Sequence, residues 1–292
     1  MARIAVLGLG RMGAAIARRL EDAGHDLVVW NRSPGPAAEF AGRGVEVLDT
    51  PATALQRADI CIAMLADSPA LESVALGADG VLAHADGGTL IDMSTISADS
   101  SAQIAAEAER AGVAFLRAPV SGNPSVVAAG NLGIIASGPR GTFDDLTPVL
   151  RDIGPKLFYV GPGEQARVVK LALNLMIGGT TQLLAEALVL AERHGIDRRQ
   201  MLEVMAGSAI GSPFVSYKTE GLVADDYSST FTVELGAKDL GLAIASGESA
   251  GVPLPATALT LELLRACIAE GMGGLDMTAL LPRLRREAGL DG

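Results

Sequence analysis

The feature that most constrains the fold is the glycine-rich stretch "VLGLGRMG", which directly follows the apolar run near the start of the chain. Gly8, Gly10 and Gly13 have the G-x-G-x-x-G spacing within a strand–helix–strand pattern that closes at Trp30. In such a unit the glycines permit a tight turn, close approach of a pyrophosphate, and close packing of helix on strand. The sequence therefore predicts a dinucleotide site here. The alternative is a glycine turn in a fold that binds no nucleotide.

Short β-rich runs alternate with helical segments over residues 3 to about 160. The runs are "RIAVLGL", "DLVVW", "VEVL", "ICIAML", "TLIDM" and "VAFLRA", with "NLGIIAS" and "KLFYV" expected at the sheet edge. Residues 12–23 are expected to form a helix that Gly24 caps. This alternation predicts an α/β fold, a Rossmann-type doubly wound, mostly parallel sheet wrapped by helices.

The pattern changes after "GPGEQ", because no later segment has a convincing strand pattern. Five segments are expected to be helices: residues 166–194, 198–206, 233–249, 255–270 and 278–288. We therefore predict a nucleotide-binding domain at residues 1–161. An all-helical substrate and dimerisation domain is expected at residues 162–292, beginning with a long interdomain helix.

That long helix also predicts an assembly. It spans about 29 residues and is apolar nearly all round, so neighbours should cover it on several sides. A helical domain of about 130 residues has few ways to provide this cover alone. A homodimer or a dimer of dimers is therefore expected.

Charge and composition exclude several classes of protein. The formal net charge is -11, and such a surface repels phosphate backbones, so nucleic-acid binding is not expected. The two cysteines have apolar neighbours and indicate buried thiols in a reducing cytoplasm, and the three histidines show no zinc-ligand spacing. The N-terminal apolar run lacks a signal-peptide pattern. The most apolar long stretch, residues 168–190, is interrupted by polar and charged side chains, so no membrane span is expected.

The end of the second expected strand, "WNRSP", bears on the choice of cofactor. NAD sites usually carry Asp or Glu there, but this chain has Asn31, followed by Arg32 and Ser33. A carboxylate would repel a 2′-phosphate, whereas a guanidinium can pair with it through two hydrogen bonds. The sequence therefore favours NADP over NAD. A solvated arginine in a turn is the other interpretation.

Several further motifs occur in order along the chain. They are "DMSTIS" at residues 92–97, "APVSGN" at 118–123, Lys170 followed four residues later by Asn174, and "FTVELGAKDLGLA", which contains Lys238. With "GLGRMG", they make essentially the whole chain resemble the β-hydroxyacid dehydrogenase family. That family includes 3-hydroxyisobutyrate dehydrogenase, tartronate semialdehyde reductase and NADPH-dependent glyoxylate/succinic semialdehyde reductases.

The resemblance implies roles for individual residues. It implies that Lys170 and Asn174 are catalytic. It implies that the substrate is bound by Ser121, Gly122, Asn123 and Lys238. It implies that the cofactor is bound by Gly8, Leu9, Gly10, Arg11, Met12, Gly13, Asn31, Arg32, Ser33, Met64, Leu65, Ser94, Thr95 and Lys238. The other interpretation of Lys238 is one half of a surface ion pair with Asp239 or Glu234.

The chain departs from the family pattern at four places. Asn123 stands where a second glycine is often found, Arg117 where Asp is common, Ala66 where proline is usual, and Leu173 where a further asparagine often precedes Asn174. Asn123 is the most consequential, because it puts a side chain where the family often leaves only backbone. The identity of the substrate is therefore left open.

Lys170 and Asn174 share one face of the expected helix, since four residues make about one turn. A lysine in water has a pKa of about 10.4, and burial lowers this value. A desolvated Lys170 could therefore accept a proton in alcohol oxidation and return it in reduction, with Asn174 holding the lysine or the substrate hydroxyl in line. The other interpretation is a lysine whose stem is buried while its ammonium reaches water.

The leading hypothesis is an NADP-dependent dehydrogenase of small β-hydroxyacids, or a reductase of the matching semialdehydes. An imine reductase is the near rival, although those enzymes usually hold Asp, Tyr or Asn at the lysine position. A 6-phosphogluconate-type enzyme would need a His-Asn pair near the lysine, which "KLALNLM" lacks. A non-catalytic NADP-binding module is the alternative from another class, and it would need no proton carrier.

Overall fold

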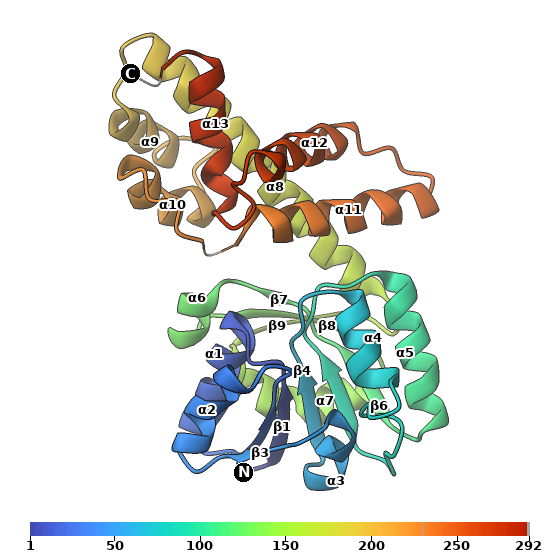
Figure 1. Cartoon of the computed structure of the whole chain (residues 1–292). Helices are drawn as coiled ribbons and strands as arrows, with labels where there is room; N and C mark the ends of the chain where they lie inside the picture. Colours follow the sequence, from blue (N-terminus) through green and yellow to red (C-terminus); the bar gives the residue numbers. More distant parts are fainter. Residues whose placement is uncertain (230, 291–292) are drawn as a thin grey trace. The chain divides into compact units, whose positions relative to one another are not determined.

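The computed structural model describes residues 1–229 and 231–290. The chain divides into two compact units, Met1–Lys170 and Leu171–Gly292 (Figure 1). The first unit holds the sheet and the second is helical, so the predicted fold class is confirmed. Residue 230 and the last two residues of the expected C-terminal domain lie outside the described part.

The sheet of the first unit has nine strands in the order β3-β2-β1-β4-β5-β6-β8-β7, with β9 paired to β8. Their bounds are β1 Arg3–Leu7, β2 Asp26–Trp30, β3 Glu46–Val47, β4 Ile60–Ala63, β5 Thr89–Asp92, β6 Ala114–Arg117, β7 Val120–Ser121, β8 Gly133–Ser137 and β9 Lys156–Gly161. The pairs within β1 to β6 are parallel, whereas β8 runs antiparallel to β6 and β7. The chain leaves β1 towards β2 and β3 and returns to β4 on the other side. This reversal makes the carboxyl ends of β1 and β4 the switch point of the sheet, the place where such sheets bind ligands.

Both faces of the sheet are covered by helices, which explains why its strands are apolar at nearly every position. Along β1, Ile4 and Val6 belong to the core on one face, and Ala5 and Leu7 to the core on the other. The first core includes side chains of α1 (Arg11–Asp22), α2 (Pro34–Gly42), α6 (Pro124–Ala128) and α7 (Arg140–Ile153). The second includes side chains of α3 (Ala54–Arg57), α4 (Ser68–Leu76) and α5 (Ala98–Arg110), next to the 3₁₀ turn η1 (Pro51–Thr53).

The second unit packs its helices around one apolar core. Its elements are α8 (Gln165–Arg193, which begins in the first unit), α9 (Arg198–Ala206), α10 (Pro213–Val223), α11 (Val233–Ser249), α12 (Pro255–Ala269), η2 (Met277–Ala279) and α13 (Leu280–Glu287). Leu188, Leu202, Leu240 and Leu264 are almost fully buried in this core. The helix expected at residues 278–288 is split into the 3₁₀ turn η2 and the helix α13. The helix α10 was not predicted.

The helix α8 keeps much of its apolar surface exposed within the single chain. Met176 is 65% exposed, Leu183 65% and Leu190 64%, and these residues are spaced seven apart. By length and composition alone, α8 is the helix of the described residues that could cross a membrane, and 39% of its most apolar window is buried. Long core helices of other proteins have the same properties, so this finding assigns no membrane location.

Candidate active site

The glycine loop between β1 and α1 has a shape that fits a dinucleotide. Gly8 has a φ of 93°, and a Cβ there would lie 2.4 Å from the carbonyl oxygen of Met64. A Cβ on Gly13 would lie 1.8 Å from the carbonyl oxygen of Gly8. Around Gly10, by contrast, no protein atom would lie within 4 Å of a Cβ. The first and third glycines are thus required for packing, and the second leaves open space where a pyrophosphate can approach.

The N-terminus of α1 adds the donors that such an anion needs. Gly10 is the N-cap of α1, so no side chain caps this end, and the first turn has no acidic residue. Free N–H groups at a helix N-terminus favour negative charge. Leu9 is buried, so only its backbone is available to a ligand, whereas Arg11 is exposed and Met12 half-buried.

At the end of β2, Asn31 uses both ends of its amide inside the protein. Its Oδ1 accepts from the backbone N–H of Leu9 at 2.8 Å, and its Nδ2 donates to the carbonyl oxygen of Ser33 at 2.8 Å. The side chain therefore ties the glycine loop to the turn that precedes α2. Arg32 and Ser33 are exposed beside it, and α2 begins with Pro34.

The carboxyl ends of β4 and β5 meet through Ser94. Its hydroxyl accepts from the N–H of Leu65 at 2.9 Å, and its own N–H donates to Asp92 at 2.9 Å. Ser94 is fully buried, so its side chain fixes these two loops, while Thr95 beside it is half-buried. Because β1, β2, β4 and β5 are parallel, the glycine loop, Asn31, Met64–Leu65 and Ser94–Thr95 all lie at one edge of the sheet.

The expected substrate segment lies between β7 and α6. Ser121 and Gly122 are exposed, and Gly122 has a φ of 144°, a conformation that favours glycine. The Oδ1 of Asn123 accepts from the N–H of Val126 at 3.0 Å and from the hydroxyl of Ser125 at 2.6 Å. Asn123 therefore serves as the N-cap of α6. This explains locally why a side chain is present where the family often has glycine.

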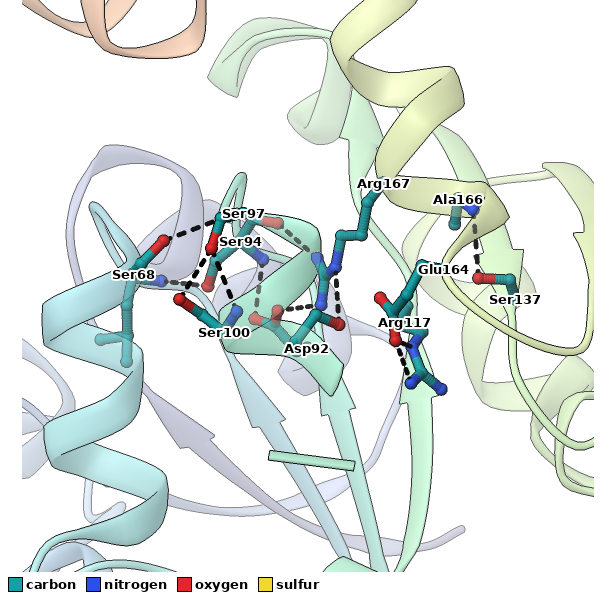
Figure 2. A network of polar contacts seen from close by, with 12 residues as sticks. Ser68, Asp92, Ser94, Ser97, Ser100, Arg117, Ser137, Glu164, Ala166 and Arg167 are labelled. Atoms are coloured by element: carbon teal, nitrogen blue, oxygen red, sulfur yellow. Dashed lines mark hydrogen bonds and ion pairs between the residues drawn. The ribbon is translucent and has the colours of Figure 1, made fainter. Parts of the chain in front are cut away.

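A buried polar network fixes the start of α8 (Figure 2). Arg167 is 1% exposed; its guanidinium pairs with Asp92, donates to the carbonyl oxygen of Ser94 at 2.8 Å and contacts the hydroxyl of Ser101 at 3.2 Å. Beside it, Arg117 pairs with Glu164. Sequence reasoning did not assign a role to Arg167, although an arginine inside an apolar helix was the signal that could have revealed it.

The second unit brings Asn174, Asp239 and Lys238 together. Asn174 is 4% exposed and Asp239 is 3% exposed, and the Nδ2 of Asn174 donates to the Asp239 carboxylate. Lys238 Nζ lies 3.0 Å from the other oxygen of Asp239. A carboxylate can only accept, so Asp239 turns the Nδ2 of Asn174 towards itself and leaves Oδ1 to accept from a ligand or a lysine. Lys170 is half-buried one turn earlier on α8, the last residue of the first unit.

Comparison with known proteins identifies the family of both parts of the chain. Residues 3–161 match the NAD binding domain of 6-phosphogluconate dehydrogenase. Residues 164–284 match the NAD-binding region of NADP-dependent 3-hydroxyisobutyrate dehydrogenase.

Full-length relatives extend the likeness. An uncharacterized oxidoreductase, YfjR of Bacillus subtilis, is 35% identical over 96% of this chain and 98% of its own. Glyoxylate/succinic semialdehyde reductase 1 of Arabidopsis thaliana is 30% identical over 97% of this chain and 98% of its own. The solved structure of Mycobacterium tuberculosis 3-hydroxyisobutyrate dehydrogenase with L-serine is 30% identical, with a TM-score of 0.87 over 98% of this chain and 99% of that one. The chain therefore belongs to the β-hydroxyacid dehydrogenase family, as an oxidoreductase of the 3-hydroxyisobutyrate dehydrogenase type with an NAD(P)-binding Rossmann domain.

Proposed function

We propose that this protein is an NADP-dependent oxidoreductase in which Lys170 is the general acid and base. Its substrate is a small β-hydroxyacid or the corresponding semialdehyde. The observation that carries this proposal is the placement of Lys170 one helical turn before an asparagine whose amide is fixed by Asp239. A structural lysine needs no oriented amide beside it, whereas a proton carrier benefits from one.

Bound NADP supplies the acceptor or donor of the hydride. In the oxidative direction neutral Lys170 would take the proton of the substrate hydroxyl, while the hydride would leave the carbon that bears this hydroxyl and pass to the nicotinamide. In the reductive direction the Lys170 ammonium gives this proton to the carbonyl oxygen of the substrate. Asn174 Oδ1 accepts from the lysine or the hydroxyl and keeps the two groups in line, because Asp239 holds its Nδ2.

The preference for NADP rests on the end of β2. An aspartate at position 31 could accept from Leu9 N–H but would place a negative charge near a 2′-phosphate. Asn31 accepts the same hydrogen bond without that charge. The exposed Arg32 then offers a guanidinium that can bind the phosphate through two hydrogen bonds.

The substrate class rests on the donors between β7 and α6 and on the relatives. Ser121 offers a hydroxyl, and Gly122 and Asn123 offer backbone N–H groups to a carboxylate. Lys238 adds a positive charge whose counter-ion is Asp239. The semialdehyde reductase and the hydroxyisobutyrate dehydrogenase among the relatives act, by their names, on small carboxylates or aldehydes.

Two other functions remain as competitors. An imine reductase on this fold would be expected to carry Asp, Tyr or Asn at the position of Lys170, so the lysine favours alcohol and carbonyl chemistry. A non-catalytic NADP-binding module would need neither Lys170 nor an amide fixed by Asp239.

The test is single-turnover hydride transfer from NADPH to a panel of semialdehydes and cyclic imines. Lys170→Ala should bind NADPH normally but transfer hydride about 10²–10⁴-fold more slowly, the usual worth of a positioned acid or base. Lys170→Arg should not restore the rate, since a guanidinium cannot give up its proton near neutral pH. Asn174→Ala should lower the rate less.

Each contrary result points to a different alternative. A Lys170→Ala variant that keeps the wild-type rate with both ligands bound would show that the lysine is structural. A wild type that reduces cyclic imines faster than any semialdehyde would establish the imine reductase function. A wild type that binds NADPH but turns over none of these substrates would favour the binding module.

A further inference from the structure

Three strand ends of the first unit converge on the first turn of α8 (Figure 2). Asp92 is the last residue of β5 and pairs with Arg167. Arg117 is the last residue of β6 and donates through Nε to Glu164 Oε1 at 2.7 Å. Ser137, the last residue of β8, accepts from the N–H of Ala166 at 3.1 Å. The ends of β5, β6 and β8 thus hold this helix end at three separate points.

The two ion pairs alternate in sign. Asp92 and Arg117 are register partners on neighbouring parallel strands, so a negative and a positive group stand side by side at the sheet edge. Opposite them, Glu164 precedes α8 and Arg167 lies in its first turn. We call Asp92, Arg117, Glu164 and Arg167 the charge quartet. Exchanging the charges of one ion pair, while the other pair is kept, would place like charges next to each other.

Stability alone is a weak reason for such a quartet. The Asp92 and Arg167 side chains are 0% and 1% exposed, and a buried ion pair often contributes no more to stability than apolar residues of similar volume. What buried charges do provide is geometry, because every donor and acceptor must be met from a defined direction. Arg167 meets Asp92, Ser94 and Ser101 at once.

We propose that the charge quartet, acting chiefly through Arg167, is a positioning device that fixes the Ser94–Thr95 loop and the start of α8 in one register. Arg167 holds the carbonyl oxygen of Ser94, and Asp92 holds its N–H, so both sides of the Ser94 backbone are set by one ion pair. Lys170 follows three residues later on the same helix. A shift of Arg167 would therefore move the loop and Lys170 relative to each other.

This inference rests on the proposed function for its kinetic consequence only. Misplacement of reacting groups by about 1 Å can cost a factor of about 10² in rate, so loss of the quartet should slow hydride transfer. Its structural consequence is independent of substrate. Without Arg167, the Ser94 and Leu65 amides should open more readily in the free protein.

The experiment compares Arg167→Gln and Arg167→Lys with the wild type by amide hydrogen exchange and by single-turnover hydride transfer from NADPH. In Arg167→Gln, exchange of the 92–97 segment should accelerate about tenfold or more, while exchange of β1 stays unchanged. Hydride transfer should slow about tenfold or more at saturating ligand. Arg167→Lys keeps the charge opposite Asp92 but lacks the planar fork that also reaches Ser94, so it should regain thermal stability without regaining the rate.

A matched control is the buried ion pair of the second unit. Lys218 Nζ lies 2.6 Å from Asp276, with side-chain exposures of 9% and 2%. Lys218→Met should lower stability without accelerating exchange of the 92–97 segment. If Arg167→Gln does not fold, the double variant Asp92→Asn/Arg167→Gln takes its place, because it leaves no charge unpaired. The same changes in amide exchange and in hydride-transfer rate are expected for it.

The outcomes separate this proposal from the proposed function. Unchanged exchange at 92–97, or a hydride-transfer rate within about twofold of the wild type in a folded Arg167→Gln variant, would overturn the positioning role. Full recovery of the rate in Arg167→Lys would also overturn it, because the fork geometry would then be unnecessary. If the wild type reduces no carbonyl substrate, the proposed function is refuted. Accelerated amide exchange in Arg167→Gln would then still support the positioning of the 92–97 loop.

Discussion

Asn31 shows how one amide can combine a structural task with a choice of ligand. Its Oδ1 accepts from Leu9 and its Nδ2 donates to the carbonyl oxygen of Ser33. An aspartate could make only the first of these bonds, and it would face the Ser33 carbonyl with a negative charge. The sequence predicted that Asn31 and Arg32 favour NADP, but it could not reveal that the Asn31 amide is used up inside the protein.

The first prediction concerns Arg32 and Asn31. Arg32→Ala should weaken NADPH binding by about one to two decades and NADH binding little, because only NADPH carries the 2′-phosphate. Asn31→Asp should also lower the preference for NADPH over NADH, since the aspartate charge repels the 2′-phosphate. Fluorescence titration of both cofactors against the wild type and each variant checks this. Equal losses for the two cofactors would contradict it.

The second prediction concerns the two cysteines. Burial raises the pKa of the Cys267 thiol to about 11 and that of Cys61 further still. At pH 8 about one Cys267 in a thousand would then be a thiolate, and the thiolate is the reactive form. A disulfide reagent should modify neither thiol in the native protein and both in denaturant. Rapid labelling of the native protein would contradict the burial.

Among the secondary-structure elements, those in which apolar residues follow one clear periodicity over many residues were predicted well. "DLVVW" is β2, and α9 and α11 have the expected bounds. Among the elements that were missed are β7 and α10. A two-residue strand such as β7 has no period to detect, since it exists only through pairing with β8. In α10 the buried positions include Lys218, whose partner Asp276 lies 58 residues away, so the apolar stripe is broken by a charge.

The same limit explains what sequence reasoning missed in the candidate site. The motifs located the glycine loop, Ser94, Lys170 and Asn174, because each follows a recognisable local pattern. The charge quartet depends on the meeting of β5, β6 and α8, which are distant in sequence. Arg117 was noted only as a departure from the family pattern. Its partner Glu164 supplies the physical reason why an arginine is tolerated there.

The third prediction tests the alternation of charge at the carboxyl ends of β5 and β6. Arg117→Glu or Glu164→Arg alone should cost up to about 3–5 kcal/mol, because each places like charges together at a site where Arg117 is 8% and Glu164 23% exposed. The double reversal should recover only part of this loss, since it restores the pair but puts a glutamate beside Asp92. A double-mutant cycle in chemical denaturation measures the coupling. Strictly additive losses would show that Arg117 and Glu164 do not interact.

The chain has a sheet unit and a helical unit, as the change from strand to helix periodicity after "GPGEQ" predicts. The number of chains in the assembly cannot be read from that periodicity. Assembly depends on which apolar surface stays uncovered once the single chain has folded, and periodicity cannot separate that surface from the core. The structure identifies such a surface on α8, where Met176, Leu183 and Leu190 are exposed at heptad spacing.

The fourth prediction is that the protein forms at least a dimer through this stripe of α8. Leu183→Glu should shift the light-scattering mass towards the monomer at micromolar concentration, because it puts a charge in the centre of the stripe. Leu259→Glu is the matched control, since Leu259 is 63% exposed but lies on α12. A monomeric wild type would refute the dimer. A dimer that persists in Leu183→Glu would refute the stripe of α8 as its interface.

The uninterrupted course of α8 has a mechanical consequence. Lys170 and Asn174 are carried by one continuous helix of 29 residues that contains no proline. Their separation along the helix axis is therefore set by the helical rise of about 1.5 Å per residue. A viscous co-solvent should therefore slow the diffusion of substrate and product but leave the rate of the chemical step unchanged, because this spacing is not rebuilt in each turnover.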